Sequence, residues 1–207
     1  MRRQLVFVLL MINLNSVAQW NISGEYYFRR HELVAAFNFS PDGKFQFFYS
    51  YGAVDRNSKG SFLIEGDSLK LRAEKEPGKD FKLTSQSRQG KGYRIKFEHP
   101  NKHLLKNITC LFLTGAEQVE AQSDANGEVQ VELAHCDTIY VQHELFPDIA
   151  TLVKDKQNDN NFFTLSLQPS LEQVSFLGIE FKIQSDSSIT CLPNYLLPME
   201  RIEFVRE

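Results

Sequence analysis

Apolar and polar residues alternate along most of this chain, and that period of two limits what the chain can fold into. The alternation is regular from Leu33 to Phe39 and again from Phe45 to Tyr51, on either side of the turn signal Pro41-Asp42-Gly43. A strand with one buried face has this period, whereas an amphipathic helix repeats about every 3.6 residues. The 17 Phe residues point the same way, because aromatic side chains favour strands. The sequence therefore predicts an all-β protein.

Residues 24–98 are predicted to form an antiparallel β-meander of about seven strands. After the first hairpin, apolar positions alternate on both sides of Gly66-Asp67, which is typical of a second hairpin. The segment 52–59 between these hairpins is mostly polar, and we expect it to be a loop.

The strand pattern lapses at His99-Pro100-Asn101-Lys102, where Pro and Asn interrupt both helical and ladder hydrogen bonding. Residues 20–100 are therefore predicted to be one β unit and residues 104–207 a second one with the character of a β-sandwich. Within the second unit, Asp124-Ala125-Asn126-Gly127 predicts a hairpin turn, because Asn-Gly accepts a positive φ at low cost.

Residues 1–19 have the order of regions found in a signal peptide. Two arginines follow Met1, the run Leu5–Leu14 is apolar, and Ser16 and Ala18 are small residues at the positions that a signal peptidase requires. The apolar run is shorter than the roughly 20 residues that span a membrane. We expect an exported protein, periplasmic or secreted, whose mature chain starts at residue 19 or 20. Lipidation is not expected, because no Cys lies near the cleavage site.

Composition excludes several partner classes. Hydrophobic residues make up 42% of the chain and charged residues 24%, as in an ordinary folded soluble protein. The formal net charge of −3 provides no basic surface for nucleic acid, and the mature chain offers no transmembrane span. The expected partner is an envelope protein or a small ligand of unknown identity, and the oligomeric state is left open.

Three cysteines, Cys110, Cys136 and Cys191, lie in the exported part of the chain. An oxidising compartment permits one disulfide with one thiol left over, and the sequence does not select among the three pairings. A nucleophilic Cys near His135 or His143 is the functional alternative to cysteine as a small buried hydrophobe.

Candidate metal ligands are His135, His143 and Asp148, close to Cys136-Asp137, but their spacing matches no familiar zinc site. No Gly-x-Ser-x-Gly, Walker-type loop or His-Glu-x-x-His helix is present. We therefore predict no catalytic residue, no metal and no cofactor, and we regard the three residues as weak candidates only.

Candidate ligand-binding residues come from the first unit. Asp55 and Arg56 are interpreted either as a ligand-facing pair or as a polar loop tip joining two strands. The aromatic residues Phe47 and Tyr49 would line a cavity in a carrier protein, but aromatic stripes at strand spacing usually fill a core.

About 85 residues of the second half resemble a known domain. The turn Asp124-x-x-Gly127, the alternating residues 128–133, the segment Cys136-Asp137-Thr138-Ile139 and the corner at Phe146-Pro147 follow one another in an order similar to that of the carboxypeptidase regulatory-like domain. The resemblance implies a seven-stranded transthyretin-like or Ig-like β-sandwich, which serves as a structural or adhesive module, usually without catalysis. The tail from residue 175 to residue 207 extends past the usual end of that domain.

Residues 23–71 resemble the lipocalin-like repeats of small exported bacterial β-proteins. The motifs Gly24-x-Tyr26, Phe39-x-x-Asp42-Gly43-x-Phe45 and Gly60-x-Phe62 carry this resemblance, although the family usually has Trp where this chain has Phe62. The resemblance implies a lipocalin-like or partial barrel with an apolar ligand cavity.

Three classes of function are compatible with the sequence. A noncatalytic module of the bacterial cell envelope fits the two β units and the missing catalytic motifs. A small apolar-ligand carrier is the second reading. An enzyme with dispersed catalytic residues is the third, because nucleophile and base need to be neighbours only in space.

Overall fold

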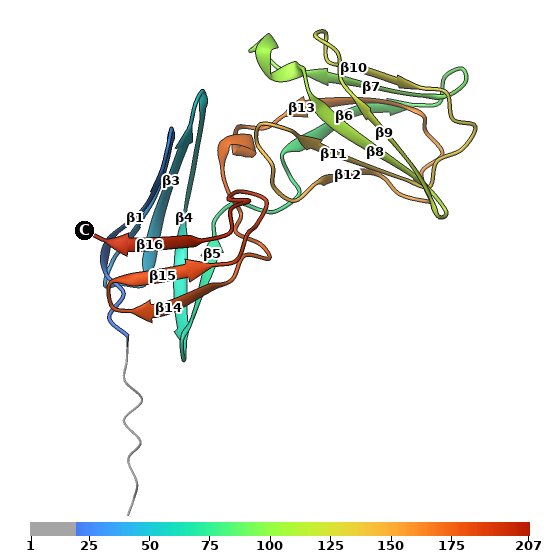
Figure 1. Ribbon diagram of the computed structural model, residues 1–207. Helices are drawn as coiled ribbons and strands as arrows, with labels where there is room; N and C mark the ends of the chain where they lie inside the picture. The colour runs from blue at the N-terminus through green and yellow to red at the C-terminus, as the bar shows by residue number, and fades with distance from the viewer. Residues whose placement is uncertain (1–19) are drawn as a thin grey trace, which may run out of the picture.

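The computed structural model describes residues 20–207, and strands account for nearly all of its regular structure (Figure 1). The prediction of an all-β protein is confirmed. Regular helix in this range consists of two single turns, η1 (Lys102–Leu105) and η2 (Pro169–Glu172). Neither has the length or the apolar character to cross a membrane. The predicted signal peptide lies outside the described residues.

Eight antiparallel strands close into a barrel. Five of them come in sequence from the first part of the chain: β1 (Gly24–Arg30), β2 (Leu33–Phe39), β3 (Lys44–Tyr51), β4 (Val54–Glu65) and β5 (Ser68–Ala73). The other three come from its end: β14 (Phe181–Ser185), β15 (Ser188–Cys191) and β16 (Ile202–Arg206). β5 pairs with β14 and β16 pairs with β1, so the barrel is an up-and-down meander interrupted once. Figure 1 shows the late strands, in red, beside the early ones, in blue.

The interruption between β5 and β14 is a second unit built from two four-stranded sheets. One sheet has the order β10 (Glu128–Val131), β7 (Tyr93–Glu98), β13 (Phe162–Leu167) and β6 (Phe81–Ser87). The other has the order β12 (Thr151–Lys154), β11 (Thr138–His143), β8 (Ile108–Thr114) and β9 (Glu117–Gln122). Residues from both sheets, such as Ile95 and Phe112, belong to one buried apolar cluster. We call this part the inserted sandwich.

The predicted boundary between residues 100 and 104 is wrong. The barrel and the inserted sandwich instead meet between β5 and β6 and again between β13 and β14. β7, before that point, pairs with β10 and β13, which come after it, and β14–β16 of the predicted second unit close the barrel. The segment around Pro100 is a connection within the inserted sandwich. Leu105 next to it is 1% exposed, and its carbonyl accepts a hydrogen bond from Ser123 Oγ. Alternation indicates that a segment is a strand but not which strand it pairs with, and this explains the error.

Aromatic rings fill the middle of the barrel. The ring centroid of Phe37 lies 4.7 Å from that of Phe47, 5.0 Å from that of Phe204 and 5.5 Å from that of Phe176. Phe176 belongs to the segment that leads from the inserted sandwich back to the barrel. Its ring also packs at 4.9 Å against Phe47, so the returning segment completes the barrel core.

The predicted loop at residues 52–59 is wrong, because β4 runs through it. Tyr49 is paired with Arg56, and Phe47 with Ser58, in a regular antiparallel register. Polar residues form a strand here because those that face inward are hydrogen-bonded: Ser58 Oγ donates to the carbonyl of Val174 at 2.7 Å.

The predicted turns at Gly43, Gly66 and Gly127 are confirmed. Each of these glycines has a positive φ, of 77°, 63° and 78° respectively. The sequence therefore located these chain reversals correctly, two in the barrel and one in the inserted sandwich.

Candidate functional site

Buried charged residues gather where the chain passes between the barrel and the inserted sandwich. Lys75 follows β5, Asp80 precedes β6, and Asp148 lies between β11 and β12. Lys75 Nζ lies 2.9 Å from Asp80 Oδ1 and 2.7 Å from Asp148 Oδ2. The three side chains are at most 5% exposed. Together with Arg56 we call these residues the junction cluster.

Arg56 brings the barrel wall into this cluster. It is 2% exposed on β4, and its guanidinium donates to the carbonyl of Pro147 at 2.6 Å and to that of Gln173 at 2.8 Å. Lys75 Nζ donates to the same Gln173 carbonyl at 2.8 Å. One guanidinium therefore connects the barrel to the inserted sandwich and to the segment that returns from it.

The pKa values of the two carboxylates are shifted in opposite directions. Burial raises the pKa of Asp80 above its ordinary value, and the positive charge of Lys75 opposes that shift only in part. Burial also pushes the pKa of Asp148 upward, but hydrogen bonds from Lys75 and Ser175 outweigh it and leave that pKa below the ordinary value. Ser175 donates through both its hydroxyl, at 2.6 Å, and its backbone N–H, at 2.9 Å.

The charges of the junction cluster balance one another. Lys75 pairs directly with both carboxylates, Arg56 adds a second positive charge, and all four groups are buried. A buried charge is strongly destabilising without a partner, and these partners all come from the chain itself. A catalytic group must contact its substrate, and these side chains are closed off from solvent. The arrangement is therefore suited to holding two parts of the protein together.

The candidate metal ligands do not converge. His135 is exposed and pairs with Asp137 at 3.0 Å. His143 is 1% exposed, and both ring nitrogens are engaged, with Leu145 N–H donating to Nδ1 and Nε2 lying 3.2 Å from the carbonyl of Leu104. Asp148 belongs to the junction cluster. Within residues 20–207, no three His, Cys, Asp or Glu side chains are placed to hold a metal ion.

All three cysteines are free thiols, so none of the possible pairings is formed. Burial raises the pKa of the Cys110 and Cys136 thiols and raises that of Cys191 to about 12. Each is therefore protonated near neutral pH. A nucleophilic cysteine is activated by a lowered pKa, and the three thiols have the opposite property.

The ligand-binding candidates of the first unit are separated by the barrel wall. Asp55 and Arg56 are neighbours on β4 and point to opposite faces, with Asp55 exposed and Arg56 buried. Phe47 and Tyr49 face inward at 3% and 8% exposure and belong to the barrel core.

Sequence reasoning missed Lys75 and Asp80. They lie in the charged stretch Glu74–Asp80, which looks like an ordinary solvated loop. No pattern in that stretch marks two of its charges as buried, because Asp148 and Gln173, the partners of Lys75, are distant in the sequence.

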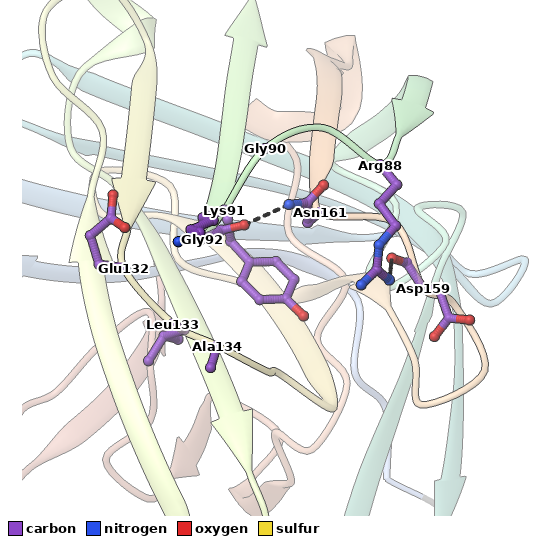
Figure 2. A pocket seen from close by; sticks show the side chains of 10 residues that line it. Arg88, Gly90, Lys91, Gly92, Glu132, Leu133, Ala134, Asp159 and Asn161 are labelled. Carbon is purple, nitrogen blue, oxygen red and sulfur yellow. Dashed lines mark hydrogen bonds between the residues drawn. The ribbon is translucent and has the colours of Figure 1, made fainter.

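A polar recess of about 460 Å³ opens at one end of the inserted sandwich (Figure 2). Asn161 shapes it by donating to the carbonyls of Gly92, at 2.7 Å, and Gln89, at 3.0 Å, while its Oδ1 accepts from Gln89 N–H at 2.7 Å. Arg88 donates to the carbonyl of Asp159 at 2.9 Å. These bonds hold the turn between β6 and β7 against the segment before β13.

The recess offers hydrogen bonds and opposed charges. Arg88 and Lys91 contribute positive charge, and Glu132 and Asp159 contribute negative charge. The hydroxyl oxygen of Tyr93 is already engaged, because it accepts from the N–H of Cys136 at 3.0 Å. In the part of the chain that the structure describes, the lining holds no histidine, cysteine or serine side chain. It can bind a small polar group, but the lining lacks a nucleophile with its base.

The chain matches no protein-family model, no curated protein and no solved structure. The class of protein is therefore defined by the fold alone: an all-β protein with a closed eight-stranded barrel and two additional sheets. This architecture is compatible with a lipocalin-like barrel and with a β-sandwich.

Proposed function

We propose that this protein is an exported, noncatalytic β-module of the bacterial cell envelope with a structural or binding role. The observation that carries the proposal is the junction cluster, in which Lys75 joins Asp80 and Asp148 without exposure to solvent. The buried charged groups of this cluster are paired with one another and hold the barrel and the inserted sandwich together. In an enzyme, such groups would be expected to face a substrate.

Within this proposal, the barrel is a lipocalin-like element and the inserted unit a transthyretin-like sandwich. The motif Gly24-x-Tyr26 lies on β1, and Asp124–Gly127 forms the turn before β10, as the two resemblances require. The tail beyond residue 175 then has a role of its own, because its strands close the barrel.

A carrier of small apolar ligands is the second candidate. A carrier needs open space between the rings of Phe37, Phe47 and Phe176. Those rings are in mutual contact, with centroids 4.7 to 5.5 Å apart. This packing supports a filled core, so we rank the carrier below the structural or binding module.

An enzyme with dispersed catalytic residues is the third candidate, and it makes a different prediction for a deletion strain. Under our proposal, exposed polar residues are individually dispensable, so His135→Ala, Asp55→Ala and Glu132→Ala should each complement the deletion and restore the wild-type phenotype. The enzyme reading expects one of them to fail while the variant is folded and exported.

The complementation experiment includes Lys75→Met as its control for loss by unfolding. This variant should disappear from the envelope fraction, because it leaves two buried carboxylates without their cation. Failure of Lys75→Met with normal protein levels would contradict a purely structural role for the junction cluster.

Export is tested on the same material. N-terminal sequencing of the protein from the envelope fraction should find residue 19 or 20 first. An intact Met1 on folded cytoplasmic protein would overturn the cellular location that we propose.

A further inference from the structure

The outer wall of the barrel carries a groove between two aromatic side chains. Tyr27 on β1, Ala36 on β2 and Phe48 on β3 lie at one level, because Tyr27 is paired with Ala36 and Ala36 with Phe48. Phe48 is 44% exposed, and Tyr27 is half-buried. The space between the two aromatic residues has a volume of about 270 Å³. We call it the barrel groove.

Strand spacing sets the width of the barrel groove. Adjacent strands lie about 4.8 Å apart, so β1 and β3 are separated by about 9.6 Å. Ala36 between them contributes only a methyl group. A ring held between two apolar walls needs about 3.5–4.0 Å on each side, or about 7–8 Å in total. The groove is therefore wide enough for one ring.

Arg29 covers one face of the Tyr27 ring, so only the other face is open to a ligand. Its guanidinium lies 4.2 Å from the centroid of the Tyr27 ring and forms an ion pair with Glu207. One face of the Tyr27 ring is thus occupied within the protein. The ring is held in place by this contact and by its hydroxyl, which donates to Glu25 Oε2 at 2.7 Å.

A row of hydrogen-bonding side chains lines the same groove. Glu25, Asn38 and Gln46 lie two residues along from the aromatic level and are paired across the three strands. The amide groups of Asn38 and Gln46 make no hydrogen bond to any residue in the described range 20–207, and both side chains are exposed. An amide offers both donors and acceptors to a ligand.

We propose that the barrel groove binds one neutral pyranose ring of a glycan. A pyranose has an apolar face of C–H groups and a rim of hydroxyls, which matches an aromatic level beside an amide and carboxylate level. Among residues 20–207, Glu25 is the only charged residue that lines the groove, and it disfavours acidic sugars and phosphates. A lipid chain would leave the amide groups of Asn38 and Gln46 without partners. This proposal specifies a ligand class for the binding role proposed above, and it rests on that role.

The test is titration of the full mature protein with neutral trisaccharides, namely maltotriose, cellotriose, N,N′,N″-triacetylchitotriose and mannotriose, followed by ¹H–¹⁵N NMR. At least one should shift the side-chain amide signals of Asn38 and Gln46 at concentrations up to about 10 mM. Trigalacturonic acid, which is acidic, should shift neither.

Variants separate the groove from the rest of the surface. Phe48→Ala should weaken binding about tenfold, and Ala36→Leu should abolish it by filling the groove. Phe48→Trp keeps an aromatic wall and should retain binding. Leu63→Ala is the matched control, because Leu63 is an apolar residue on β4, 57% exposed and outside the groove lining. Unchanged melting temperatures exclude unfolding as the cause.

The proposal is overturned if no neutral trisaccharide shifts the Asn38 and Gln46 signals, or if Phe48→Ala binds as the parent does. It is also overturned if these signals shift with protein concentration alone, since the groove would then bind a second copy of the chain. None of these three results affects the structural role, which depends on the junction cluster and is tested by complementation.

Discussion

Lys75 and Asp148 form an ion pair in which Nζ lies 2.7 Å from Oδ2 and both side chains are no more than 1% exposed. Lys75 follows the last barrel strand before the insertion, and Asp148 belongs to the inserted sandwich. The pair therefore links two units whose apolar cores are largely separate. This contact and the hydrogen bonds of Arg56 attach the insertion to the barrel.

Replacing the lysine of this pair should be strongly destabilising. Lys75→Met leaves Asp80 and Asp148 buried without their cation, and we expect a loss of about 3–5 kcal/mol in the free energy of unfolding measured with urea. Lys79→Met is the matched control, because Lys79 is exposed and should change stability by less than about 0.5 kcal/mol. Equal stability of the two variants would contradict the role of the cluster.

His143 should make stability fall in mild acid. Its Nδ1 accepts a hydrogen bond from Leu145 N–H, so the buried ring is neutral, and burial lowers its pKa below the ordinary 6.5. The unfolded chain therefore binds a proton in a range where the folded one does not. The contribution of the neutral His143 ring to the free energy of unfolding is fully present above pH 6.5, the pKa of an ordinary histidine. It declines, by at most about 1.4 kcal/mol per pH unit, as the pH falls from 6.5 to the lower pKa that His143 has in the folded protein.

The measurement is urea unfolding at pH 7.5 and 5.5 on the parent and on His143→Gln. The variant has no imidazole at this position to protonate, whereas all other ionisable groups are common to both proteins. The parent should thus lose more stability between the two pH values. The same loss in both proteins would show that His143 does not carry the effect.

Substitutions at two turn glycines can distinguish the cost of backbone strain from the cost of a close atomic contact. At Gly127 the φ is +78° and an added Cβ would lie 2.9 Å from the carbonyl oxygen of Phe97, whereas at Gly66 the φ is +63° with nothing within 4 Å. Gly66→Ala should cost about 1 kcal/mol from backbone strain alone. Gly127→Ala should cost more, about 2 kcal/mol or above, because the Phe97 backbone must also move. A thermal melt of each variant compares them, and equal effects would reject the close approach.

Phe47 and Phe48 test whether the barrel is filled. They are neighbours on β3 with opposite faces, at 3% and 44% exposure. Phe47→Ala should cost about 3–5 kcal/mol by opening a cavity among the rings, and Phe48→Ala should cost less than about 1 kcal/mol. Denaturant unfolding of both variants decides the matter. A small cost for Phe47→Ala together with a bound apolar molecule would favour the carrier.

Local features of this protein were readable in its sequence. Alternation from Leu33 to Phe39 predicted a strand, and Asn126-Gly127 predicted a turn with positive φ, because both depend on neighbouring residues only. The buried state of Phe47 and Tyr49 was also the expected reading of an aromatic stripe. The polar stretch before Phe62 was misread as a loop, because the inward-facing Arg56 and Ser58 find their partners far away in the sequence.

The sequence by itself determined that the chain forms strands and where many of them turn, since period and turn chemistry are local properties. Only the tertiary structure decided that β14–β16 return to close the barrel around an insertion, because pairing is a choice among many similar strand edges. It also decided which charges are buried. Lys75 became the centre of the junction because folding removed water from it and placed Asp80 and Asp148 within 3 Å, a pairing that no sequence pattern specifies.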